Sequence, residues 1–364
     1  MTPVTKPFLP PLEEFSAYLE KIWKSEVITN NGPYHQQLEA ELCEKLGVEY
    51  ISLFNNGTIA LITALKALDI RGEVITTPFS FVATAHSLVW NGLTPVFADI
   101  EDDGFNIDVN KIEGLITEKT QAIMPVHCYG RPCDVERIEK IAKKHNLSVI
   151  YDAAHAFAVE KDSKSILNYG DLSVISFHAT KVFNTFEGGA IVCQSKEMKD
   201  KIDSLKNFGI EDEVTVSNVG INGKLSEINS AFGLIQLKYL EYCVTKRKSV
   251  FDFYNEQLSD VSGLELPISL HTEGNYSYYP IRVLDNFKLS RDELYEYLKH
   301  FGILSRRYFY PLISDMPMYK GYPSAQPEAL PNAHQASQQV LCLPIYPTIT
   351  PEELNNIVNA IKRV

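Results

Sequence analysis

The chain has 364 residues, and its 34 Lys and Arg against 46 Asp and Glu give a formal net charge of −12. Hydrophobic residues make up 45% and charged residues 22% of the chain, which is ordinary globular usage and excludes disordered and fibrous proteins. The acidic balance, without any block of basic residues, argues against nucleic acid as a partner. The length predicts two domains.

Targeting, membrane and metal-binding patterns are missing from the sequence. The first residues lack the basic-then-apolar layout of a signal peptide, and no apolar run approaches the roughly 18 residues that cross a bilayer. The six cysteines form no C-x-x-C pair, and the nine histidines show no H-E-x-x-H spacing. We therefore expect a cytoplasmic protein with reduced thiols, no membrane contact and no metal.

Short β-branched runs alternate with helical patterns between about residues 35 and 240. Strands are predicted at 50–54, 73–76, 94–99, 121–126, 148–151 and 172–176, and helices at 58–68, 81–90 and 134–144. Asp134 is the expected N-cap of the third of these helices. Such alternation predicts an α/β fold with a mostly parallel sheet covered by helices on both faces.

The composition changes near residue 240, where a long helix is predicted to begin within residues 239–248. Helices are predicted at 291–301 and 351–361, with aromatic loops between them at 276–280 and 308–311. We place a boundary here, which divides the chain into a large domain, 1–240, and a smaller C-terminal domain, 241–364.

Several common motifs are lacking. No G-x-G-x-x-G follows a predicted strand, which argues against a nicotinamide or flavin Rossmann site. Residues 220–226 look superficially like a P-loop, but Asn218 stands where its first glycine belongs and no Ser or Thr follows Lys224. A serine hydrolase is disfavoured because no G-x-S-x-G occurs.

Polar residues follow several of the predicted strands. Asn56-Gly57-Thr58 lies between a strand and a helix, where backbone N–H groups can bind phosphate. Taken alone, a turn with an ordinary N-cap is the better explanation of this segment. Asp152 ends another strand, and ligands of open α/β sheets bind outside the carboxyl ends of the strands. A loop cap is an equally good explanation of Asp152 taken alone.

Lys181 differs from the other lysines because it follows a strand, lies among small and apolar residues and precedes the glycine pair 188–189. A partly desolvated lysine can lose its proton and form a Schiff base with an aldehyde. The order of the three features matches what pyridoxal phosphate requires: Gly57 and Thr58 for the phosphate, Asp152 for the pyridinium nitrogen and Lys181 for the aldehyde.

This ordered set resembles the DegT-type (DegT/DnrJ/StrS) sugar-nucleotide aminotransferases, and the resemblance covers essentially the whole chain. The matching segments are Asn56–Leu61, Thr77–Ala85, Asp152–Ala156, Ser176–Lys181, Gly220–Glu227, Ala231–Leu237 and Leu341–Pro347. The resemblance implies fold type I, the aspartate aminotransferase-like three-layer sandwich with a mostly parallel central sheet and a smaller C-terminal α+β domain. It also implies a transaminase that uses pyridoxal 5'-phosphate.

The resemblance assigns a role to each matching residue. Lys181 would be the catalytic residue; Gly57, Thr58 and Ser176 would bind the cofactor's phosphate, Phe81 would stack on its ring, Asp152 would bind its nitrogen and His155 would lie near its hydroxyl. Asn222 would reach the phosphate in the neighbouring subunit, which implies a homodimer with shared active sites. Two departures, Asn56 in place of a frequent Ser and Lys224 in place of a frequent Arg, leave the contacts of those two positions open.

The segments around Lys181 and Asn222 look most like family members that aminate dTDP-4-keto-6-deoxyglucose to dTDP-4-amino-4,6-dideoxyglucose. The substrates implied are this nucleotide sugar and L-glutamate, for polysaccharide, O-antigen or glycoside biosynthesis. A 3-keto nucleotide sugar is the alternative substrate. Two further alternatives are a sugar dehydratase, disfavoured because Lys181 is present where the similar dehydratases have His, and a non-catalytic regulatory protein on the same fold.

Overall fold

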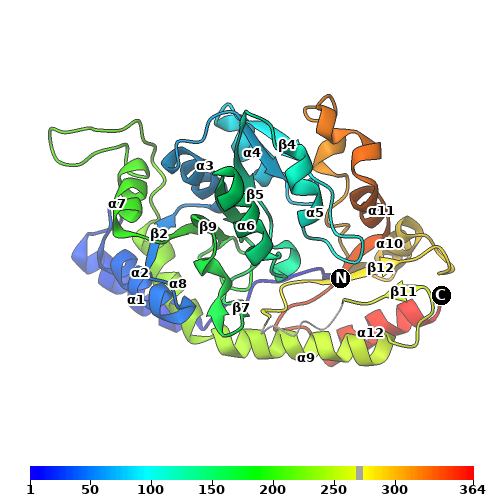
Figure 1. Cartoon of the computed structure of the whole chain (residues 1–364). Coiled ribbons are helices and arrows are strands. Elements are labelled where there is room, and N and C mark those ends of the chain that lie inside the picture. The colour runs from blue at the N-terminus through cyan, green and yellow to red at the C-terminus, as the bar shows by residue number, and fades with distance from the viewer. Residues whose placement is uncertain (268–273) are drawn as a thin grey trace.

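The computed structural model describes residues 1–267 and 274–364 (Figure 1). Its helices are α1 (Leu12–Ser25), α2 (Pro33–Leu46), α3 (Gly57–Ala67), α4 (Ala83–Trp90), α5 (Val109–Ile112), α6 (Val135–His145), α7 (Lys196–Leu205), α8 (Glu227–Lys238), α9 (Leu240–Leu258), α10 (Arg291–His300), α11 (Pro331–Gln339) and α12 (Pro351–Lys362). Its strands are β1 (Thr2–Pro3), β2 (Tyr50–Phe54), β3 (Glu73–Thr76), β4 (Thr94–Phe97), β5 (Thr120–Met124), β6 (Ser148–Asp152), β7 (Glu160–Lys161), β8 (Lys164–Ser165), β9 (Leu172–Ser176), β10 (Gly189–Cys193), β11 (Leu264–Glu265), β12 (Tyr279–Val283), β13 (Ile303–Leu304) and β14 (Val340–Leu343).

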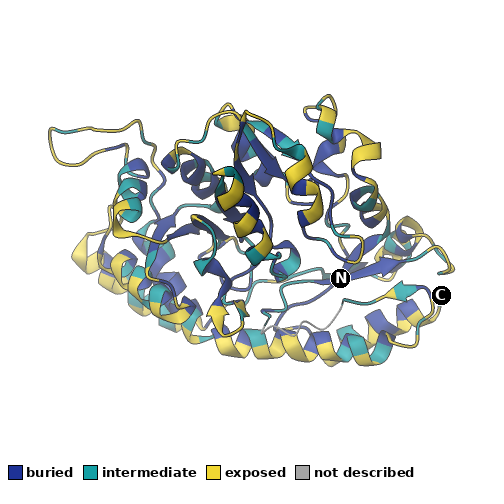
Figure 2. Ribbon diagram, in the orientation of Figure 1, coloured by how far each residue is buried: buried dark blue, intermediate teal, exposed yellow. Residues whose placement is uncertain are grey.

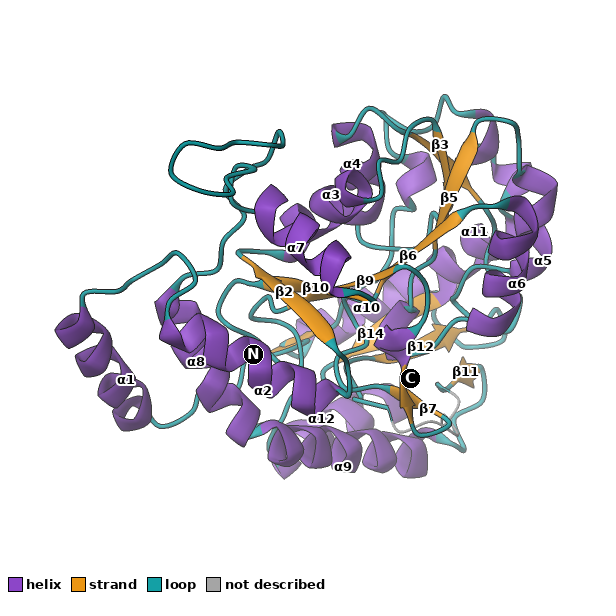
Figure 3. Ribbon diagram, turned by 60° about the vertical axis from the view of Figure 1, so that its left-hand side comes forward, coloured by secondary structure: helices purple, strands orange, loops and turns teal. Residues whose placement is uncertain are grey.

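A seven-stranded sheet in the order β2-β10-β9-β6-β5-β3-β4 forms the centre of the large domain. All its pairs are parallel except those of β10, which runs antiparallel to both β2 and β9. Side chains alternate between two cores: one with α3, α4 and α7 on one face, and one with α2, α6 and α8 on the other. Figure 3 shows helices on both sides of this sheet. The predicted α/β fold with a mostly parallel, doubly covered sheet is confirmed.

The predicted strands and helices agree with the structure except at their ends. The strands 50–54, 73–76 and 172–176 coincide with β2, β3 and β9, and the Asp134 side chain caps α6 by accepting from the Arg137 N–H. The strand predicted at 94–99 is wrong beyond Phe97, because the Asp99 carboxylate turns away to accept the N–H groups of Asn332 and Ala333 at the start of α11.

The strand predicted at 121–126 ends at Met124, because Pro125 has no N–H for the ladder. The sequence analysis did not predict β10, whose five buried residues fill the gap between β2 and β9.

The C-terminal part has its own core around the three-stranded sheet β11-β12-β14, built from α9, α10, α12 and these strands. Helix α9 begins in the first core with Leu240 and continues into the second with Val250 and Tyr254, and it runs along one side of the whole molecule in Figure 1. The short strand β1 pairs with β13, so the N-terminus packs on this C-terminal part. The domain boundary between residues 240 and 241 remains a prediction.

The central sheet is buried, whereas one long loop is exposed to solvent. The strands of the central sheet are buried, whereas the loop between α7 and α8 projects from the molecule with its residues exposed (Figures 1 and 2). All six cysteines are free thiols. Within the described ranges, no helix combines the length and apolar content needed to cross a membrane.

Candidate active site

A cavity of about 270 Å³ lies where the carboxyl ends of β2, β6 and β9 meet. The predicted residues that line it are Gly57, Thr58, Phe81, Asp152, His155, Ser176 and Lys181. They come from four loops because strands that run in the same direction end at one edge of the sheet. The structure therefore places almost the whole predicted set in one cavity.

The turn after β2 presents the N-terminus of α3 to this cavity. Asn56 caps the helix by accepting the Ile59 N–H at 2.8 Å, which leaves the first N–H groups of the helix free to bind an anion. A Cβ on Gly57 would lie 3.2 Å from Ser176 Cβ, and one on Gly189 would lie 2.7 Å from Gly57 N. The turn is thus both a capped helix start and a suitable phosphate site, held against β9 and β10.

Asp152 is almost fully buried at the end of β6. Its carboxylate accepts the Thr84 hydroxyl at 2.7 Å and the Ala154 N–H at 3.2 Å. Burial raises the pKa of Asp152, while these two hydrogen bonds and the charge of Lys181 act in the opposite direction. A cation placed in the cavity beside this carboxylate would offset the cost of its burial, as a protonated pyridine nitrogen would.

His155 presents one ring nitrogen to the backbone and leaves the other available. The Tyr129 N–H donates to Nδ1 at 3.2 Å, which places the proton of the neutral ring on Nε2. Burial lowers the pKa of His155 well below its ordinary value, so the ring is neutral. Phe309 stacks on it with a centroid distance of 6.1 Å and an interplanar angle of 5°. His155 can therefore donate a hydrogen bond without adding charge.

Lys181 follows β9 in a tight turn, in which its N–H donates to the His178 carbonyl at 2.9 Å. Burial lowers the pKa of its ammonium to about 8, although Asp152 raises it. A lysine with such a pKa supplies far more free amine at neutral pH than an ordinary lysine does. Its Nζ donates to the hydroxyl of Tyr278 at 3.3 Å.

Phe81 and Asn222 stand apart from the buried part of the site. Phe81 is 59% exposed on the rim of the cavity, so one face of its ring is available for stacking. Asn222 is exposed and does not line the cavity. The side-chain amide of Asn55 donates a hydrogen bond to the backbone carbonyl of Asn222 at 3.5 Å. The roles predicted for the individual site residues remain predictions.

Several further residues that line the cavity were not among the predicted site residues. They are Ser80, Glu187, Tyr278, Tyr308 and Phe309. The last three belong to the aromatic loops at 276–280 and 308–311, so their clustering in the sequence was visible, but only folding brings them to Lys181. No group of three or more His, Cys, Asp and Glu in the described parts of the chain is arranged to hold a metal ion.

The residues fit pyridoxal phosphate. A free helix N-terminus suits its phosphate, a buried carboxylate suits its nitrogen, a neutral imidazole N–H suits its hydroxyl and an amine of lowered pKa suits its aldehyde. The exposed ring of Phe81 can cover one face of the cofactor's ring.

Comparison with known proteins also indicates an aminotransferase, over nearly the full length of the chain. The model of the DegT/DnrJ/EryC1/StrS aminotransferase family matches residues 12–362. A dTDP-4-amino-4,6-dideoxy-D-glucose transaminase of Shigella dysenteriae is 58% identical over 99% of this chain and 98% of its own length. A transaminase of the same name from Escherichia coli is 57% identical over 96% of this chain and 95% of its own.

Solved structures share the fold. The structure of DesI in the presence of its TDP-sugar product superimposes with a TM-score of 0.95 at 31% sequence identity. The match covers 100% of this chain and 92% of the DesI chain. The site, the fold and these matches agree: the chain belongs to the DegT/DnrJ/EryC1/StrS aminotransferase family and is an aminotransferase that works with pyridoxal 5'-phosphate.

Proposed function

We propose that this enzyme transfers the amino group of L-glutamate to C4 of dTDP-4-keto-6-deoxyglucose and forms dTDP-4-amino-4,6-dideoxyglucose. The relatives from Shigella dysenteriae and Escherichia coli, at 58% and 57% identity, carry the name of this activity. Their similarity supports the choice of sugar and nucleotide. The product would serve O-antigen or other polysaccharide biosynthesis, and the free thiols suit an enzyme of the cytoplasm.

One observation carries the chemistry: the amine of Lys181, with its pKa lowered to about 8, shares a cavity with the buried carboxylate of Asp152. When bound, pyridoxal phosphate supplies an aldehyde for amine exchange and a ring that accepts electrons. The Asp152 carboxylate would keep the ring nitrogen protonated, and the Nε2–H of His155 would donate to the ring hydroxyl. The neutral state of His155 leaves Asp152 as the buried negative charge paired with that nitrogen.

Lys181 would act twice. Its free amine would hold the aldehyde of the cofactor between turnovers, and whenever it is free it would lie beside the reacting carbon of the substrate. There it would take a proton from one atom of the substrate and return it to another. The N-terminus of α3, with Gly57, Thr58 and the Ser176 hydroxyl, would hold the phosphate and so fix the ring relative to Lys181.

We also propose a homodimer in which Asn222 completes the site of the partner. Asn222 lies at the base of the projecting loop between α7 and α8, which exposes apolar side chains. Val214 is 90% exposed, Val219 is 86% exposed and Val216 is 65% exposed. Apolar residues gathered on a projecting loop favour burial against another protein surface. A symmetric partner would receive this loop and the side chain of Asn222.

The proposed activity is tested with the purified protein, its cofactor and L-glutamate. We expect a visible absorbance band that L-glutamate shifts, and amination of dTDP-4-keto-6-deoxyglucose detected by mass spectrometry and NMR. In Lys181→Ala the shift and the turnover should be lost, a decrease of about 10³-fold or more. Amination of the 3-keto isomer alone would place the reaction at C3. An unchanged response of Lys181→Ala would refute the role of this lysine.

A further inference from the structure

We propose that Tyr278 is a further catalytic residue: its hydroxyl hydrogen-bonds the amine of Lys181 and holds it toward the reacting carbon whenever that amine is free. The inference rests on the proposed role of Lys181. The Lys181 Nζ lies 3.3 Å from the Tyr278 hydroxyl and 5.9 Å from the centre of its ring. Tyr278 is therefore in direct contact with the atom that would carry the proton.

A dedicated set of hydrogen bonds positions Tyr278. The side-chain amide of Asn275, which is 2% exposed, donates to the carbonyls of His155 and Phe157, both at 2.9 Å. The hydroxyl of Ser277 donates to the same His155 carbonyl at 3.3 Å. The segment that carries Tyr278 is thus hydrogen-bonded to the loop after β6. Asp152 is the last residue of β6, so these bonds connect the two sides of the cavity.

Arg247 of α9 supports the same segment from the other side. Its buried guanidinium donates to the Ser277 carbonyl at 3.4 Å and to the Ile345 carbonyl at 3.0 Å. The Tyr278 segment is therefore held by the C-terminal part of the chain as well as by the large domain. An aromatic ring that merely closed a cavity wall would not need a buried arginine and a buried asparagine to set its backbone.

Neighbouring rings restrict the orientation of the phenol. The ring centre of Tyr278 is 4.8 Å from that of His155, 5.4 Å from that of Tyr129 and 5.8 Å from that of Tyr308. Burial raises the pKa of Tyr278 well above its ordinary value, so the hydroxyl keeps its proton. The other titratable groups that share the cavity with Lys181 are Asp152, His155, His178, Glu187 and Tyr308.

A neutral phenol suits a lysine that alternates between two protonation states. Its oxygen accepts a hydrogen bond from the ammonium, and its O–H donates to the lone pair of the neutral amine. The contact therefore persists through the cycle in which Lys181 takes a proton from the substrate carbon and returns it, without any charge being created on Tyr278. Because the hydrogen bond already orients the amine, the Lys181 side chain loses less conformational entropy at each proton transfer.

The first test measures Lys181 itself in the cofactor-free protein. Acetylation of Lys181 by acetic anhydride is followed against pH by peptide mass spectrometry, in the wild type, in Tyr278→Phe and in the matched control Tyr276→Phe. The ring of Tyr276 packs on Phe251 at 5.3 Å instead of lining the cavity of Lys181. The hydrogen bond from the ammonium is charge-assisted and thus the stronger of the two, so its loss should move the midpoint of labelling about one pH unit lower in Tyr278→Phe.

The second test measures turnover of the complete enzyme. In Tyr278→Phe we expect kcat to fall about tenfold or more, and the KM values for both substrates to stay within about twofold. The visible band and its shift with L-glutamate should remain, which distinguishes this result from the failure expected of Lys181→Ala. Wild-type kcat together with a wild-type labelling profile in Tyr278→Phe would refute the proposal. So would equal effects in Tyr276→Phe, which would indicate a structural role of the aromatic segment.

Discussion

Asp152 is the residue whose charge the proposed chemistry needs most. Replacing it by Asn keeps the size and the hydrogen bond from Thr84 but removes the negative charge that stabilises a protonated ring nitrogen. We expect Asp152→Asn to lower the rate of the half-reaction with L-glutamate by about 10²-fold or more. Stopped-flow absorbance of the half-reaction with L-glutamate measures this effect. Asp134→Asn, which keeps a good helix cap on α6, is the control and should leave the rate unchanged.

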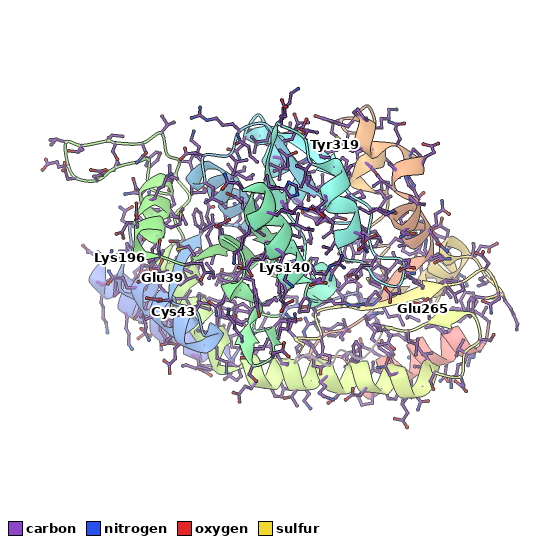
Figure 4. The ribbon with its side chains drawn as sticks, viewed as in Figure 1. Glu39, Cys43, Lys140, Lys196, Glu265 and Tyr319 are labelled. Atoms are coloured by element: carbon purple, nitrogen blue, oxygen red, sulfur yellow. The ribbon has the colours of Figure 1, made fainter. Side chains whose placement is uncertain are left out.

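Glu39, which lies outside the cavity, is a second residue whose pKa is strongly shifted by its surroundings. It lies on α2 beside α7, as the labels of Glu39 and Lys196 in Figure 4 show. Burial alone would raise the pKa of Glu39, but the hydrogen bond from His35 and the charges of Lys206 and Lys199 hold it well below its usual range. Its carboxylate also accepts the Leu53 N–H at 3.2 Å, which connects the charge cluster to β2.

Because the pKa of Glu39 is lower in the folded state, its contribution to stability is complete above the pKa of the unfolded chain. This contribution is lost as the pH falls below that value. We expect Glu39→Gln to reduce the free energy of unfolding at neutral pH by about 3 kcal/mol, since two lysines lose a carboxylate. Urea unfolding at pH 7 and pH 4 measures both effects, and the difference between the variants should shrink at the lower pH. Glu44→Gln, exposed on the same helix, is the control.

At the scale of elements, strand β10 closely approaches the turn before α3, which is the proposed phosphate site. A Cβ on Gly189 would lie 2.7 Å from Gly57 N and 2.8 Å from the Asn56 carbonyl carbon, so backbone would have to move. We expect Gly189→Ala to lower the free energy of unfolding by about 2 kcal/mol and to weaken cofactor binding at least tenfold. Thermal unfolding and titration with pyridoxal phosphate measure the two effects.

Gly114 provides the control for that substitution, because a Cβ there meets nothing within 4 Å and its φ is not positive. Gly114→Ala should leave cofactor binding unchanged and the stability equal or slightly higher. If Gly189→Ala bound the cofactor as the wild type does, the close approach of β10 would not matter for the phosphate site.

At the scale of the whole molecule, shared active sites predict complementation between inactive variants. Lys181→Ala and Asn222→Ala chains, expressed together with different tags, would form mixed dimers in which one of the two sites carries neither substitution. With random pairing, about a quarter of all sites are then intact, and about a quarter of the wild-type activity should return. Purification over both tags should raise that fraction to about a half.

If Asn222→Ala alone is impaired but its mixed dimers with Lys181→Ala regain no activity, the active site is not shared between subunits. Sedimentation of a fully active monomer would contradict the dimer itself. The exposed apolar loop between α7 and α8 would then need another partner.

Local patterns explain what could be predicted from the sequence. Strands such as 50–54 and 172–176 are short, mostly apolar runs. The Asn56-Gly57-Thr58 turn and Lys181 come within a few residues after them, and Asp152 is the last residue of β6. Because residues next to a strand end must lie at the edge of the sheet, the order of these motifs was enough to predict one shared site and its cofactor. The similarity to the aminotransferase family confirms that cofactor.

Only the tertiary structure decided which distant residues complete the cavity. Tyr278 is 97 positions from Lys181 and reaches it through Asn275 and Arg247, whose partners are backbone carbonyls elsewhere in the chain. Asp99, which was predicted to end a strand, instead caps α11, more than 230 positions away. Strand β10 lies between β2 and β9 and runs antiparallel to both. A sequence pattern records a residue's own secondary structure, whereas these contacts depend on how separate elements pack, so no local spacing could reveal them.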